Sequence, residues 1–96
     1  MTYRDMHIMY AQRYLRRFDD ILQSMTTKMK KSERTPNITL DFISEMIPHH
    51  EGAIEMSKNL LQYNNIDPKL RKLAENIICS QSEEIKLMEE IRKLQK

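Results

Sequence analysis

Apolar residues recur along this chain at spacings of three and four, the pattern of helices that bury one face. The pattern predicts three helices, at residues 3–31, 39–63 and 68–95. Strong helix formers dominate and clusters of β-branched residues are few, which favours helix over strand. Short connections between helices favour antiparallel neighbours. The sequence therefore predicts one all-α domain over residues 1–96, an antiparallel bundle of three helices.

The expected helix ends carry residues that are typical of caps. Thr2, followed three residues later by Asp5, resembles a capping box at the start of the first helix. Asp67 and Pro68 suit the N-cap and the first helical position of the third helix. Pro36 excludes helix from the first connection, because proline lacks the backbone N–H and restricts the residue before it. These local signals agree with the apolar spacing.

The second predicted helix contains two adjacent histidines in the stretch MIPHHEGAIEM. Helical geometry places His50 at the centre of the apolar stripe, and His49 about 100° away at its border. Pro48 directly precedes them and is expected to kink the helix or to leave the carbonyl of Ser44 free. A buried imidazole without a hydrogen-bond partner costs about 1–3 kcal/mol. The partner of His50 is therefore the central question about function.

The antiparallel arrangement suggests which residues of the third helix lie at the level of the histidines. A turn near Asn65 places residues whose numbers sum to about 130 opposite one another. His50 then faces Gln81, and Met46 faces Glu84. Gln81 is itself a polar residue within an apolar stripe. Two polar groups that are each unusual alone are thus expected to meet inside the bundle.

Such a polar layer permits two interpretations. Neutral imidazole is the commonest metal ligand, thioether sulfur favours soft ions such as Cu(I), and the chain contains eight methionines. The candidate metal ligands and their orienting groups are His49, His50, Met46, Met56, Glu84, Met88 and Gln81. In the alternative, His50 hydrogen-bonds Gln81 and the methionines fill gaps in the core.

The spacing of the histidines, carboxylates and glycine excludes several well-defined catalytic and binding sites. A zinc-protease site needs His-Glu-x-x-His, and the residues after Glu51 are Gly52, Ala53 and Ile54. Di-iron carboxylate bundles need two Glu-x-x-His pairs, which are absent. One glycine cannot form a phosphate-binding loop, and no catalytic grouping is supported. An enzymatic role is not predicted.

Charge and cysteine content narrow the possible partners and compartments. A formal charge of +2 gives no reason to expect nucleic acid. No apolar run is long enough to insert into a membrane, and residues 1–20 contain no signal-peptide core. The protein is expected to be cytoplasmic, or the chain is a fragment of an exported one. Cys79 has no intramolecular partner and is expected to be exposed or to lie at an interface.

The motif MIPHHEGAIEM, followed by Gln81, Glu84 and Met88 in SQSEEIKLM, resembles the domain of unknown function 305 family, a ferritin-like group of small bacterial helical proteins. Two separated motifs agree in order and spacing over residues 41–91. The resemblance implies a ferritin-like bundle, export or membrane association in bacteria, copper binding in some members and no established reaction. This chain has one His-His motif, which does not favour storage of many ions.

Together these observations predict a small metal-binding helical protein that completes its core as a homodimer. Copper is the leading ion, and zinc or another transition metal is an alternative. The rival hypothesis is a structural or interaction module in which the layer of His50 and Gln81 fixes helix register without a ligand. A third hypothesis, a phosphotransfer domain, requires an exposed reactive imidazole.

Overall fold

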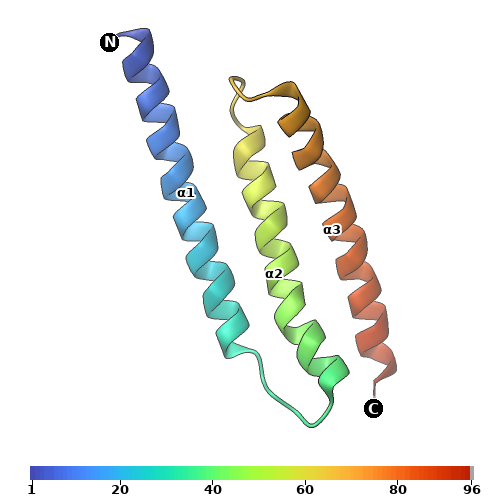
Figure 1. Ribbon diagram of the computed structural model, residues 1–96. Helices are drawn as coiled ribbons and strands as arrows, with labels where there is room; N and C mark the ends of the chain where they lie inside the picture. Colours follow the sequence, from blue (N-terminus) through green and yellow to red (C-terminus); the bar gives the residue numbers. More distant parts are fainter. Residues whose placement is uncertain (96) are drawn as a thin grey trace.

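The computed structural model describes residues 1–95 and consists of three long helices joined by two connections (Figure 1). The helices are α1 (Tyr3–Lys31), α2 (Ile38–Leu61) and α3 (Pro68–Leu94). Residues 1–95 contain no strand, so the all-α prediction is confirmed. Each helix begins and ends within two residues of its predicted bounds. Position 96, included in the predicted domain, lies outside the described residues.

The helix ends are fixed by local hydrogen bonds. Thr2 and Asp5 form the predicted capping box, with both reciprocal side-chain to backbone bonds present. Asp67 caps α3, and Pro68 occupies its first turn. The sequence interpretation did not identify Asn37, whose side chain accepts two backbone N–H groups at the start of α2. Asparagine is as favourable as aspartate at the N-cap position, so Asn37 could have been identified from the sequence.

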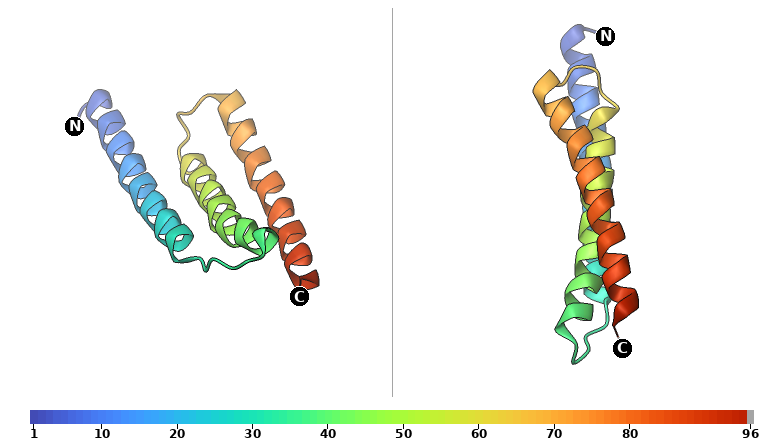
Figure 2. Two further views of the ribbon diagram at one scale, coloured as in Figure 1. Left: turned by 60° about the horizontal axis from the view of Figure 1, so that its bottom comes forward. Right: turned by 90° about the vertical axis from the view of Figure 1, so that its right-hand side faces the viewer.

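The three helices form a flat layer with α2 in the middle (Figure 2). Helix α2 packs against α1 on one side and α3 on the other, while α1 and α3 make no contact in the described residues. The principal extents are 60 × 25 × 13 Å, so the layer is one helix thick. A compact domain of this length has a radius of gyration of about 12.5 Å, whereas this chain has 16.8 Å. The closed ferritin-like bundle completed by dimerisation stays a prediction.

Only a small apolar core lies within the layer. The buried apolar side chains of the described residues are Ile21, Ile43, Ile47, Ala74 and Met88. Three of them form a cluster between α2 and α3. A layer one helix thick has little interior, which explains why long apolar stripes leave so few residues buried.

Helix α2 passes without interruption through Pro48 and approaches α1 closely at Gly52. A Cβ atom on Gly52 would lie 2.9 Å from Cγ of Met25 and 3.2 Å from its Cβ. The absence of a side chain at Gly52 therefore permits the close approach of α1 and α2.

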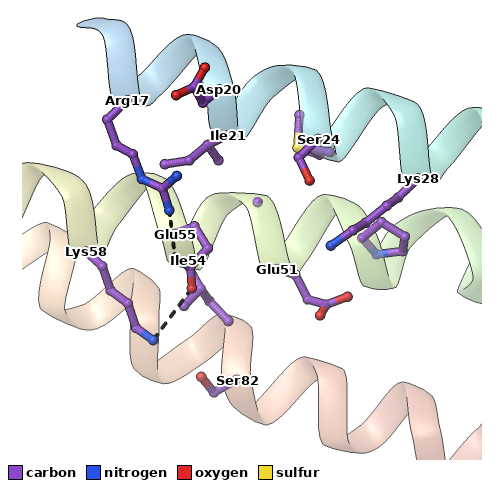
Figure 3. Close-up of a pocket in the computed structure, with 13 residues that line it drawn as sticks. Arg17, Asp20, Ile21, Ser24, Lys28, Glu51, Ile54, Glu55, Lys58 and Ser82 are labelled. Carbon is purple, nitrogen blue, oxygen red and sulfur yellow. Dashed lines mark ion pairs between the residues drawn. The ribbon is translucent and has the colours of Figure 1, made fainter. Parts of the chain in front are cut away.

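One face of the layer is lined by charged side chains (Figure 3). They border a groove of about 540 Å³ that runs over α1 and α2 and reaches Ser82 of α3. Glu55 lies 3.9 Å from Arg17 and 3.7 Å from Lys58 in ion pairs. We call this side the charged face; it comprises Arg17, Asp20, Lys28, Glu51, Glu55 and Lys58. These charges remain in contact with solvent, so this face needs no further covering.

Candidate functional site

The imidazole of His50 lies between α2 and α3 with one ring nitrogen already bonded. The residue is 9% exposed, and its Nδ1 lies 2.9 Å from the carbonyl oxygen of Met46, one turn earlier in α2. A carbonyl oxygen can only accept a hydrogen bond, so Nδ1 carries the proton that is shared. This bond fixes the orientation of the ring and directs Nε2 away from α2, as backbone carbonyls do for many metal-binding histidines.

Nε2 of His50 faces the carboxylate of Glu84 on α3. The distance from Nε2 to Oε2 of Glu84 is 3.7 Å. The same Oε2 accepts a hydrogen bond of 3.3 Å from the side-chain amide of Gln81. The Glu84 side chain is 53% exposed and that of His50 is 11% exposed. The site therefore has a buried nitrogen on one side and a carboxylate open to solvent on the other.

The predicted direct contact of His50 with Gln81 is replaced by a contact through Glu84. The antiparallel register placed the correct level of α3 opposite His50, but Glu84 lies one turn further along the helix than Gln81. The structure places the carboxylate of Glu84, and not the amide of Gln81, opposite Nε2 of His50. Gln81 instead donates its hydrogen bond to the Glu84 carboxylate.

In the neutral ring, the pair of His50 and Glu84 brings two hydrogen-bond acceptors together. With the proton on Nδ1, Nε2 has a lone pair, and an ionised carboxylate has only lone pairs. At 3.7 Å they form no hydrogen bond. Their electrostatic repulsion is relieved by a positive charge in or beside the gap, either a second proton on the ring or a metal cation.

The other predicted ligands lie in different surroundings. His49 is exposed, and its ring centroid lies 6.1 Å from that of His50. Met88 is buried in the apolar cluster, Met46 packs against that cluster, and Met56 is half-buried on α2. Within residues 1–95, no three His, Cys, Asp or Glu side chains converge to hold a metal ion. Among the predicted ligands, the polar contacts found in residues 1–95 link His50, Glu84 and Gln81.

A second polar feature of the α2 interfaces was not predicted. Asn59 is 2% exposed and donates a hydrogen bond of 3.1 Å to the backbone carbonyl of Tyr14 on α1. Its Oδ1 is buried without a partner in the described structure. Asn59 lies three residues after Met56 and four before Tyr63 in the predicted helix, and this spacing was the available signal. The prediction that Cys79 is exposed is confirmed.

The described helices include none with the length and apolar character to cross a bilayer.

Comparison with known proteins places these motifs in a family. A protein of Acanthamoeba polyphaga mimivirus, named uncharacterized protein L153, is 46% identical over 57 residues. The match includes 56% of this chain and 37% of that protein, so the chain spans well under half of its relative. The profile of the family described as domain of unknown function (DUF305) matches residues 6–92. The match thus includes α2 and most of α1 and α3, and the chain belongs to the DUF305 family.

Proposed function

We propose that this chain is a small metal-binding helical protein in which His50 and Glu84 supply the first two ligands. The proposal rests on two hydrogen-bond acceptors that face each other, Nε2 of His50 and Oε2 of Glu84. A cation between them would turn the repulsion into two coordinate bonds. The bond from Nδ1 to the Met46 carbonyl already selects the tautomer that a metal at Nε2 requires.

The separation of the two atoms suits this role. Imidazole nitrogen and carboxylate oxygen bind transition metals at about 2.0–2.2 Å, so two such ligands at a tetrahedral angle lie about 3.4 Å apart. The observed 3.7 Å is within a small side-chain adjustment of that value. Glu84 is exposed enough to make the adjustment. Two ligands make an incomplete site, so further donors must come from thioethers, water or a second copy.

Copper is the ion that the available donors suit best. Imidazole binds Cu, Zn, Fe and Ni, whereas thioether sulfur selects Cu(I) among them. Met46, Met56 and Met88 are the candidate soft donors, although Met88 belongs to the apolar cluster and Met46 packs against it. Copper therefore remains the first ion to test, with zinc as the comparison.

Metal titration with matched variants tests the proposal. Glu84→Gln removes the carboxylate charge with little change of shape, and Glu83→Gln makes the same change at a neighbouring exposed residue that pairs with Lys86. Calorimetric titration with Cu(II), and with Cu(I) held by a competing chelator, should show affinity at least about tenfold weaker for Glu84→Gln. Glu83→Gln should match the wild type. Equal affinities for wild type and a His49→Ala/His50→Ala variant would refute the proposal.

The second candidate is a structural module, favoured by the hydrogen bond from Gln81 to Glu84. In this case His50 carries the second proton, and the imidazolium, carboxylate and amide form a polar layer that fixes the register of α2 against α3. Copper and zinc would then leave the melting temperature unchanged. Gln81→Leu would destabilise the metal-free protein by about 1 kcal/mol. A metal-binding protein would instead gain about 2.7 kcal/mol at a metal concentration of 100 times Kd.

A further inference from the structure

The face of the layer opposite the charged face is apolar. On α2, Phe42, Met46, His49, Ala53, Met56 and Leu60 follow one another at spacings of four and three. By helical geometry this seam lies about 140° around α2 from Glu55 on the charged face. Phe42 is 62% exposed, although it is a large aromatic residue. We call these six residues the α2 seam.

Both outer helices extend the apolar surface beside the α2 seam. Leu15 is 55% exposed and Leu22 is 39% exposed on α1, and on α3 Leu73 is 53% exposed and Leu87 is 55% exposed. Helical geometry turns each of these side chains away from the charged face. Hollows of about 420 and 570 Å³ lie at the two ends of the surface. One includes Leu15 and Leu60, and the other includes Phe42.

The accessible area of the chain is too large for a folded monomer of its mass. A monomer of 11.6 kDa is expected to expose about 5,800 Å². This chain exposes 7450 Å², an excess of about 1,600 Å². If each of two copies buried that excess, the interface would total about 3,200 Å², within the range of obligate homodimers.

We infer that a second copy of this chain covers the apolar face, with the two α2 helices antiparallel across a two-fold axis. The α2 seam has the same order of spacings from either end. Two antiparallel copies therefore place each seam residue opposite a seam residue of the other copy. Phe42 then lies opposite Leu60 of the second copy, Met46 opposite Met56, and His49 opposite Ala53. A self-complementary patch is what a two-fold interface requires.

This arrangement also assigns a place to His49, which the single chain leaves exposed. The small side chain of Ala53 opposite it leaves room for an imidazole. The two His49 residues would lie four positions apart along the paired helices, about 6 Å. If the proposed metal function holds, the second copy thus brings the additional imidazole that the His50–Glu84 pair of one chain lacks.

The oligomeric state of metal-free protein tests the interface independently of metal binding. With a chelator present, light scattering after size exclusion should give twice the chain mass at micromolar concentration. Phe42→Glu should weaken association about 100-fold or more, because each dimer would bury two unpaired carboxylates. Ser24 lines the same groove as the residues of the charged face, so Ser24→Glu should leave the dimer intact. A monomeric wild type, or equal effects of the two variants, would overturn the inference.

Disulfide cross-linking tests the register without weakening the interface. In a Cys79→Ser background, Phe42→Cys/Leu60→Cys should oxidise to a covalent dimer. The two positions lie about 27 Å apart along α2, so no bond can form within one chain. Phe42→Cys alone should remain uncross-linked in the antiparallel arrangement. Efficient cross-linking by the single variant would overturn this register, while failure of copper binding would leave the interface unaffected.

Discussion

Replacing Gly52 by alanine sets two opposing effects against each other. Alanine in a helix interior is favoured over glycine by about 1 kcal/mol. The added Cβ, however, would lie 2.9 Å from Cγ and 3.2 Å from Cβ of Met25. The Met25 sulfur can rotate away, but its Cβ is fixed to the backbone of α1, so α1 must move outward. Overpacking of this kind costs about 1–3 kcal/mol.

The packing cost should exceed the helix gain, leaving Gly52→Ala about 1 kcal/mol less stable than wild type. For a chain of this length the melting temperature falls by about 4–8 °C per kcal/mol. Urea unfolding followed by circular dichroism at one protein concentration measures the difference. A Met25→Ala background removes the sulfur and the Cγ at 2.9 Å and leaves only the Cβ contact at 3.2 Å. Gly52→Ala should there cost less or become neutral. The double-mutant cycle of Gly52→Ala and Met25→Ala should therefore give a coupling free energy of unfolding of about 1–2 kcal/mol.

Glu51 provides the matched control for the contribution of helix propensity to the stability of Gly52→Ala. It is exposed and adjacent to Gly52 in α2, so the stability difference between Glu51→Ala and Glu51→Gly measures backbone propensity without packing. If Gly52→Ala were stabilising by the amount that this pair gives, α1 and α2 would not approach as closely as described. The α1–α2 packing would then need revision.

Three other perturbations have defined outcomes. Asn59→Asp should lower the free energy of unfolding by about 3 kcal/mol or more, because a buried carboxylate would face the Tyr14 carbonyl; urea unfolding measures this. Arg71 donates to two carbonyl groups at the end of α2, so Arg71→Ala should cost about 1–2 kcal/mol in the same assay. The backbone N–H and the hydroxyl of Thr2 hold the pKa of Asp5 below its ordinary value, so this carboxylate stabilises the first turn of α1 at neutral pH. That contribution is lost as the pH falls through the lowered pKa. The protection factors of the first-turn amides, which are exchange rates corrected for the intrinsic rate at each pH, should therefore fall in acid for wild type, but not for Asp5→Asn.

The helices were predictable because their determinants are local. The capping box of Thr2 and Asp5, and the start of α3 at Asp67 and Pro68, depend on residues within one turn. The level at which α3 meets His50 was also predictable, because an antiparallel turn fixes the register. These parts of the fold need no knowledge of distant packing.

The remaining features do not follow from the spacing of apolar residues along the sequence. Apolar spacing shows that a helix face avoids water, but not whether the same chain covers it, so a bundle and an open layer give the same pattern. The register gives the level of α3 opposite His50, but not which of the neighbouring residues Gln81 and Glu84 faces the ring. The carbonyl of Met46 could not be identified as a partner, because every helical residue offers one.

The central place of α2 has a consequence for how the chain opens. Since the outer helices do not touch each other in the described residues, detachment of α1 removes no contact from α3. The pair of His50 and Glu84 belongs to the α2–α3 hairpin and can persist while α1 frays. An isolated chain thus resembles a short linear array whose units melt separately, and all-or-none unfolding would be acquired only when two chains join.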